Sequence, residues 1–244
     1  MKRIVEFKNA KLGYGRLAVF DFLNLDIFEG DFLGIIGPNG SGKTTLLRSI
    51  IGLLKPQAGD VIKDKNLRFG YCMQRQFIDT LFPFTVFEIV MMVRTKVIGY
   101  LRKPRSIDKQ KVLEALDITG ISGLSRERFY NLSGGQKQRT IIARALALEP
   151  SFLILDEPTT DLDVKAEREI LDLIKTLHLR QRLTIALVTH ELNEVINYAR
   201  KFMFLNKNAP YKTFERGELN EGLLSEIFET QINLKEIDGR KIVL

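Results

Sequence analysis

The chain has 244 residues, enough for one large α/β domain with a sizeable buried core, and its 45% hydrophobic and 27% charged composition argues against disorder. A single Cys excludes an internal disulfide and offers no support for secretion or a Cys-based metal site. The formal net charge of +7 is compatible with nucleic acid, an anionic ligand or a membrane surface as partner. No stretch reaches the roughly 20 apolar residues of a membrane span, and the first residues lack the apolar core of a signal peptide, so we expect a soluble chain.

Two kinds of strand are predicted along the chain. Residues 4–7 and 23–27 alternate apolar with polar side chains, as half-buried antiparallel strands do. Four later runs are almost continuously apolar, which is typical of parallel strands covered on both faces. These runs are residues 32–36, 152–155, 184–188 and 202–205.

Helical patterns separate these strands. Residues 44–54, 112–118 and 138–148 have helical spacing, and an apolar stripe runs along residues 166–177. Alternating strands and helices predict an α/β fold with a mainly parallel sheet, preceded by an antiparallel β-subdomain. The stretch from about 75 to 145 has helical patterns without a clear strand, so we predict an inserted helical subdomain there.

A glycine-rich loop joins the third strand to the first helix. It reads G-x-x-x-x-G-K-T over residues 37–44, between a strand and a helix, which is the context that a phosphate-binding loop requires. The backbone amides form a nest for phosphate oxygens, Lys43 can reach the β- and γ-phosphates, and the Thr44 hydroxyl can ligate Mg²⁺. The sequence therefore predicts a P-loop NTPase core that binds a nucleoside triphosphate. The predicted binding residues are Gly37, Pro38, Asn39, Gly40, Ser41, Gly42, Lys43, Thr44 and Thr45.

Most of the charge excess lies in one segment of the predicted helical insert. Between residues 94 and 111 only one acid, Asp108, accompanies seven basic residues, namely Arg94, Lys96, Arg102, Lys103, Arg105, Lys109 and Lys111. Two interpretations stay open: a solvated helical face, or a functional surface that faces anionic headgroups or acidic loops of a membrane partner.

A second anion nest follows in the chain. Ser133, Gly134, Gly135 and Gln136 stand just before a helical run, where a hydroxyl and glycine amides meet the start of a helix. A simple phosphate-loop kinase or GTPase has no evident use for such a nest.

An acidic pair ends the next buried strand. Asp156 and Glu157 follow residues 152–155, and carboxyl ends of parallel strands face the ligand crevice in α/β sheets. Asp156 can then hold Mg²⁺ beside Thr44, and Glu157 can orient and deprotonate the attacking water.

Taken together, these motifs resemble the ATP-binding subunit of ABC transporters over essentially the whole chain. The resemblance implies that Ser133 to Gln136 form the signature sequence that contacts ATP on a partner subunit. Further matching residues are Tyr14 for adenine stacking, Gln74 for contact with Mg²⁺ or water, Asp163 in the D-loop, and His190 for the γ-phosphate. Glu157, His190 and Gln74 are the catalytic residues, and Thr44, Gln74 and Asp156 the Mg²⁺ ligands, that the resemblance implies.

The same resemblance implies partners and a location. One chain carries one set of half-sites, so a head-to-tail homodimer is needed to complete each ATP pocket. Integral-membrane permease subunits and an extracytoplasmic solute-binding protein are expected, with the ATPase on the cytoplasmic face of the inner membrane and no nucleic acid partner. Apolar side chains in residues 77–87 would either belong to the core of the helical insert or form the surface that, in the family, receives a helix of the permease.

Several short segments are similar to the zinc and manganese uptake group. They include Asp79-Thr80, residues 82–86, Thr189 to Asn193, and the late stretch 238–244. Iron-chelate or vitamin import, and a non-transport ATPase regulating a membrane complex, stay open as alternatives. We predict a nucleotide-binding core with the β-subdomain at 1–74 and 146–206, the helical subdomain at 75–145 and a C-terminal extension at 207–244.

Overall fold

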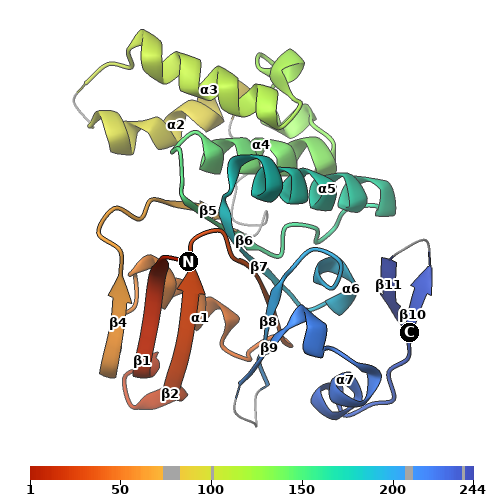
Figure 1. The fold of residues 1–244 in the computed structure, drawn as a ribbon. Coiled ribbons are helices and arrows are strands. Elements are labelled where there is room, and N and C mark those ends of the chain that lie inside the picture. The colour runs from red at the N-terminus through yellow and green to blue at the C-terminus, as the bar shows by residue number, and fades with distance from the viewer. Residues whose placement is uncertain (74–82, 100–101, 207–210, 238–239) are drawn as a thin grey trace. The chain divides into compact units, whose positions relative to one another are not determined.

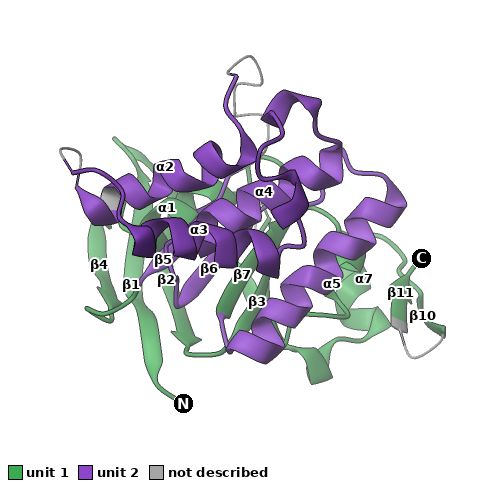
Figure 2. Cartoon of the chain, turned by 90° about the horizontal axis from the view of Figure 1, so that it is seen from above, with its two compact units in different colours: residues 1–67, 184–244 green, residues 68–183 purple. Residues whose placement is uncertain are grey.

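The computed structural model describes residues 1–73, 83–99, 102–206, 211–237 and 240–244. The chain forms two compact units, which Figure 2 shows in different colours. The first unit comprises residues 1–67 and 184–244, and the second comprises residues 68–183. None of the described helices combines the length and apolar character that a membrane span needs.

An antiparallel sheet opens the first unit (Figure 1). Strand β1 (Arg3–Tyr14) lies between β2 (Leu17–Phe28) and β4 (Ala58–Lys63). The antiparallel strands predicted at residues 4–7 and 23–27 are confirmed, because both stretches fall within this antiparallel pair. Burial alternates along residues 23–27 of β2, as in a strand covered on one face. Residues 4–7 of β1 are all buried, so this part of the central strand is covered on both faces.

Parallel strands form the second part of this unit. Strand β3 (Phe32–Ile36) pairs in parallel with β7 (Thr184–Thr189) and β8 (Lys201–Phe204), and β8 pairs antiparallel with β9 (Lys212–Glu215). Every residue of β3 and β7 is buried, which explains their continuous apolar runs. Helix α1 (Lys43–Ile51) follows β3, and the short helix α6 (Leu192–Val195) follows β7.

The C-terminal segment of this unit contains a helix and a hairpin. The short 3₁₀ turn Arg216–Glu218 leads to α7 (Glu221–Phe228), followed by the antiparallel strands β10 (Leu234–Ile237) and β11 (Arg240–Val243). The sequence analysis predicted a C-terminal extension here without its elements.

Among its described residues, the second unit has a parallel strand pair and four helices. Strand β5 (Phe69–Cys72) pairs in parallel with β6 (Phe152–Asp156). The helices are α2 (Val86–Ile98), α3 (Ser106–Ile118), α4 (Gly134–Leu146) and α5 (Val164–Gln181), with 3₁₀ turns at Ser122–Leu124 and Phe129–Asn131. Helix α4 packs against α2, α3 and α5, so it is the central helix of this unit.

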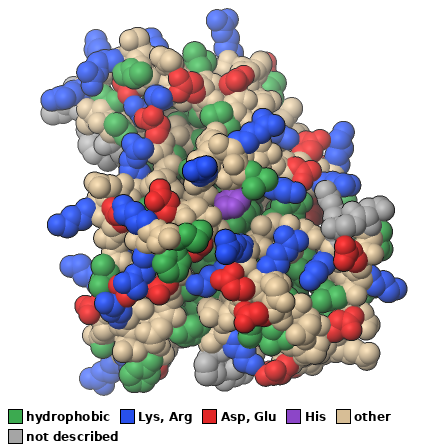
Figure 3. Space-filling view, viewed as in Figure 1, with side chains coloured by type: hydrophobic (Ala, Val, Ile, Leu, Met, Phe, Trp, Pro, Cys, Tyr) green, Lys and Arg blue, Asp and Glu red, His purple; other side chains and the backbone are tan. Residues whose placement is uncertain are grey.

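Some basic side chains of the segment 94–111 are buried or paired with acidic residues, and so do not form an exposed basic surface. Arg94 is 5% exposed, and its guanidinium donates to Asp108 Oδ1 at 2.9 Å and to the Ala147 carbonyl at 3.0 Å. Lys111 pairs with Glu114 and Glu149, each at 3.0 Å. Arg94 of α2 therefore hydrogen-bonds to α3 and to the C-terminal end of α4. On the face seen in Figure 3, basic side chains are interspersed with acidic ones.

The predicted α/β fold with a mainly parallel sheet and an antiparallel β-subdomain is confirmed. Each apolar run became a strand within one or two residues of its expected bounds. The proposed domain boundaries stay a prediction, since the compact units divide the chain at different residues.

Candidate functional site

The phosphate loop bridges the end of β3 and the start of α1. Gly42 caps α1 with φ of 98°, and Gly40 also has positive φ, at 82°. A Cβ on Gly42 would lie 2.6 Å from Val19 Cγ1, and one on Gly37 would lie 2.5 Å from the Leu205 carbonyl oxygen. Only glycine fits these positions, so the loop backbone can curl with its amides facing inward.

Polar groups of this loop suit a phosphate ligand. The buried Lys43 ammonium donates to the Gly37 carbonyl at 2.6 Å and to the Pro38 carbonyl at 3.2 Å, so it spans the loop. Ser41 Oγ is buried and has no hydrogen-bond partner among the described residues. A buried hydroxyl of this kind normally has a partner, and a phosphate oxygen would provide one. Thr44 is exposed at the start of α1, where its hydroxyl is a suitable oxygen ligand for Mg²⁺.

Tyr14 lies at the end of β1 and is 45% exposed. Its hydroxyl accepts a hydrogen bond from Arg48 Nη1 of α1 at 3.1 Å. This bond links Tyr14, the residue predicted to stack on adenine, to the helix that starts at the phosphate loop. An exposed aromatic ring held in this way can stack on a base.

His190 is brought next to the phosphate loop. It follows β7 directly, and the Gly37 N–H donates to the carbonyl of Thr189 at 3.3 Å. His190 lines a cavity of about 790 Å³ together with Gly37, Pro38 and Asn39. That volume lies within the range of small-molecule sites.

The same cavity has a wall from the C-terminal segment. Its lining continues with Phe204, Leu205 and Asn206, with Lys212, and with the end of α7 at Glu226, Ile227, Phe228 and Glu229. Lys212 and Glu226 form an ion pair at 2.5 Å. Sequence analysis missed this wall, because no motif marks α7.

The acidic pair ends β6 in the second unit. Asp156 is 9% exposed, and the Tyr71 hydroxyl donates to its Oδ2 at 3.0 Å. Glu157 has φ of 49°, a left-handed conformation that is uncommon outside glycine and concentrates at functional sites. Tyr71 is a residue that the sequence analysis missed, since β5 was not predicted and its alternating burial offers only a weak signal.

The second anion nest forms the start of α4. Ser133 is the N-cap, with its Oγ accepting from the Gln136 N–H at 3.4 Å, and Gln136 Oε1 accepts from the Ser133 N–H at 2.9 Å. This reciprocal capping box satisfies two amides and leaves other amides of the first turn for an anion. Ser133 is exposed, as an intermolecular role requires.

Asp163 caps the neighbouring helix. Its Oδ1 accepts from the Ala166 N–H at 2.8 Å at the start of α5. A Cβ on Gly135 would lie 3.2 Å from Ala166 Cβ, so the starts of α4 and α5 pack closely. The structure thus brings the signature residues and Asp163 together.

Part of the predicted site around residue 74 lies outside the described residues. Gln74 falls outside them, as does much of the apolar surface 77–87. The thiol of Cys72, at the end of β5, is buried, and burial raises its pKa to about 12. Met73, just past the end of β5, is 38% exposed.

The ABC transporter family matches residues 20–160 of the chain. The molybdate import ATP-binding protein MolC of Haemophilus influenzae is 36% identical over 89% of this chain and 87% of its own length. The manganese transport system ATP-binding protein MntB of Listeria monocytogenes is 35% identical over 83% of this chain and 87% of its own length.

Solved structures give the same result. A protein described as a metal-chelate type ABC transporter, in an inward-facing conformation, superposes with a TM-score of 0.90 and 32% identity over 100% of this chain and 96% of that one. A dimeric bacterial ABC transporter cassette superposes with a TM-score of 0.71 and 29% identity, covering 87% and 99% of the two chains.

Proposed function

This chain belongs to the ABC transporter family as the ATP-hydrolysing subunit of an importer, and from that premise we propose that the imported substrate is a divalent metal cation, zinc or manganese. The observation that carries the proposal is the similarity to a manganese transport ATPase over most of both chains. The segments from Thr189 to Asn193 and 238–244 support it, since both resemble the zinc and manganese group.

The proposed chemistry gives the candidate site residues distinct roles in binding and hydrolysing ATP. Lys43 and the loop amides hold the β- and γ-phosphates, and Tyr14 stacks on adenine. Glu157 orients the attacking water and takes its proton, while Gln74 contacts that water and His190 hydrogen-bonds the γ-phosphate. Thr44, Gln74 and Asp156 would hold Mg²⁺, which would neutralise phosphate charge when bound.

The assembly follows from the number of half-sites in one chain. ABC ATPase cassettes form dimers and work with membrane permease subunits. We extend this to a homodimer in which Ser133 to Gln136 of one subunit contact the ATP held by the other. The same proposal includes an extracytoplasmic binding protein and a peripheral position on the cytoplasmic face of the membrane.

The substrate is tested with the complete transporter in vesicles. ATP hydrolysis is measured while the binding protein is loaded with Mn²⁺, Zn²⁺, molybdate or a ferric chelate. Stimulation by Mn²⁺ or Zn²⁺ alone supports the proposal. Molybdate is included because MolC is a similar protein. Stimulation by molybdate or by the ferric chelate would contradict the assignment of zinc or manganese as substrate. The assignment of the chain as an ATPase would still hold.

The role of Glu157 has its own test. Removal of a general base typically costs about 10²–10⁴ in rate. Glu157→Gln should therefore bind ATP with unchanged affinity, lose hydrolysis by that factor, and accumulate as an ATP-bound dimer in size-exclusion chromatography. Normal turnover by this variant would contradict the assignment.

A further inference from the structure

The C-terminal strand is tied to the helix that follows His190. Asn193 Nδ2 donates to the Val243 carbonyl at 3.1 Å, and its Oδ1 accepts from the Val243 N–H at 2.8 Å. Asn197 makes the same pair with Lys241, at 2.8 Å and 2.9 Å. The two side-chain amides therefore hydrogen-bond to the backbone of β11 in the way that a neighbouring strand would.

The spacing of the two asparagines matches that of the strand. Residues four apart in a helical turn lie on one face, separated by about 6 Å along the axis, and alternate residues of a strand are about 6.8 Å apart. Residues 240, 242 and 244 of the hairpin face β10, as the Asn233–Leu244 backbone pair shows. Lys241 and Val243 therefore point their backbone groups outward, toward the two amides.

Hydrogen bonds connect the helical turn that carries Asn193 to the phosphate loop. Glu194, next to Asn193, is buried and accepts a hydrogen bond from the Thr189 hydroxyl. The same hydroxyl accepts from the Glu191 N–H at 3.0 Å. His190 lies between these two residues, and the Thr189 carbonyl accepts from Gly37 of the phosphate loop.

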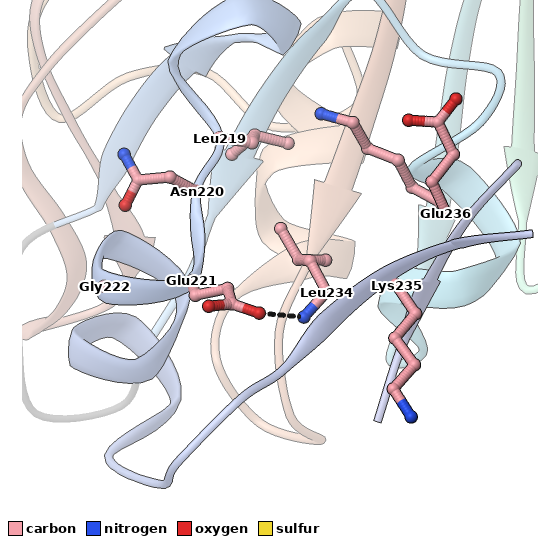
Figure 4. Close-up of a pocket in the computed structure, with 8 residues that line it drawn as sticks. Leu219, Asn220, Glu221, Gly222, Leu234, Lys235 and Glu236 are labelled. Carbon is pink, nitrogen blue, oxygen red and sulfur yellow. Dashed lines mark hydrogen bonds between the residues drawn. The ribbon is translucent and has the colours of Figure 1, made fainter. Parts of the chain in front are cut away.

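The other end of the hairpin is tied to α7. Glu221 Oε1 accepts from the Leu234 N–H at 2.7 Å, the bond drawn in Figure 4. Phe228, at the end of α7, lines the cavity that contains His190 and also a smaller cavity of about 240 Å³ with Glu191 and Val243. The C-terminal segment thus borders the His190 turn through both α7 and β11.

We infer that Asn193 and Asn197 are positioning residues, which use β11 as a fixed support to hold the turn that presents His190 to the γ-phosphate. This inference rests on the proposed role of His190. Both sequence stretches that resemble the metal-uptake group, Thr189 to Asn193 and 238–244, contribute to this one contact.

The test compares hydrolysis with ATP binding in the complete transporter. A misplaced catalytic group lowers turnover by about 10-fold or more. Asn193→Ala should lower kcat by about 10-fold with ATP affinity unchanged, and Asn193→Asp, which keeps the acceptor toward Val243 but loses the donor, should fall between it and the wild type. Deletion of residues 240–244 removes the partners of both asparagines, so it should lower kcat at least as much as Asn193→Ala. Adding Asn193→Ala to the deletion should cause no further loss.

Asn233→Ala is the matched control, because Asn233 pairs with Leu244 through its backbone. It should keep wild-type kcat. An equal loss in this control, or additive losses in the combined variant, would overturn the inference. If His190→Ala is inactive while Asn193→Ala has wild-type kcat, the positioning role alone is wrong. If His190→Ala keeps wild-type kcat, the proposed role of His190 is wrong and the inference falls with it.

Discussion

Single residues set the shape of the nucleotide site through steric limits and hydrogen bonds. Gly42 has positive φ, and Val19 leaves no room for a Cβ there, so both backbone and packing require glycine. Lys43, Ser133 and Glu157 were all predicted from motif patterns, because phosphate chemistry demands those residue types. Tyr71 and Asn193 were not assigned a contact from sequence, since the residues that they meet, Asp156 and Val243, lie 85 and 50 positions away.

Gly42→Ala should impair ATP binding more than folding. Strain at such a position costs about 1–3 kcal/mol, which corresponds to about 5- to 150-fold in affinity if the loop must move to bind ATP. The measurement is ATP affinity by isothermal titration. Gly30→Ala is the control, since Gly30 also has positive φ (78°) but no atom lies near its Cβ position. It should lower the melting temperature and leave ATP affinity unchanged.

Helices and strands could be predicted where the pattern of apolar residues is strong. They could not be predicted where contacts between distant residues determine the structure. The buried strands β3, β6 and β7 are apolar throughout, so their patterns sufficed. Strands β4 and β10 carry only exposed or half-buried residues, and residues 241–243 of β11 are half-buried, so no apolar pattern marks these strands. Charge counting failed for Arg94, because sequence does not reveal that its guanidinium is buried between helices.

The Arg94–Asp108 pair makes α2 and α3 sensitive to acid. The Arg105 N–H and the Arg94 guanidinium donate to the Asp108 carboxylate and hold its pKa below the ordinary value. Since the folded pKa is the lower one, this stabilisation is complete above the ordinary pKa and is lost as pH falls through the lowered pKa. Asp108→Asn should therefore lower the urea midpoint at pH 7 and remove this part of the acid sensitivity.

Urea unfolding followed by circular dichroism at pH 7 and near pH 3 measures both effects. Asp117→Asn is the control on the same helix, because Asp117 is exposed. A wild-type urea midpoint for Asp108→Asn at pH 7 would contradict the stabilising role of the pair.

At the scale of the whole molecule, the chain has the groups for one phosphate nest and one signature nest. Lys43 and His190 belong to the first unit, whereas Ser133, Asp156 and Glu157 belong to the second. In the proposed homodimer each ATP uses the phosphate loop of one subunit and the signature residues of the other. Defects in the two nests should then complement each other between subunits.

Mixing two inactive variants tests this arrangement directly. Lys43→Ala disables the phosphate loop and Ser133→Arg disables the signature nest, so each homodimer has two defective sites. A mixed dimer has one site with both defects and one intact site, and random pairing makes half of the dimers mixed. If sites act independently, the mixture should recover up to about a quarter of wild-type hydrolysis. Mixing Lys43→Ala with the double variant Lys43→Ala/Ser133→Arg should recover none, because no intact site forms. Recovery in that control, or none in the first mixture despite dimer formation, would mean that Ser133 does not act on the ATP of its partner.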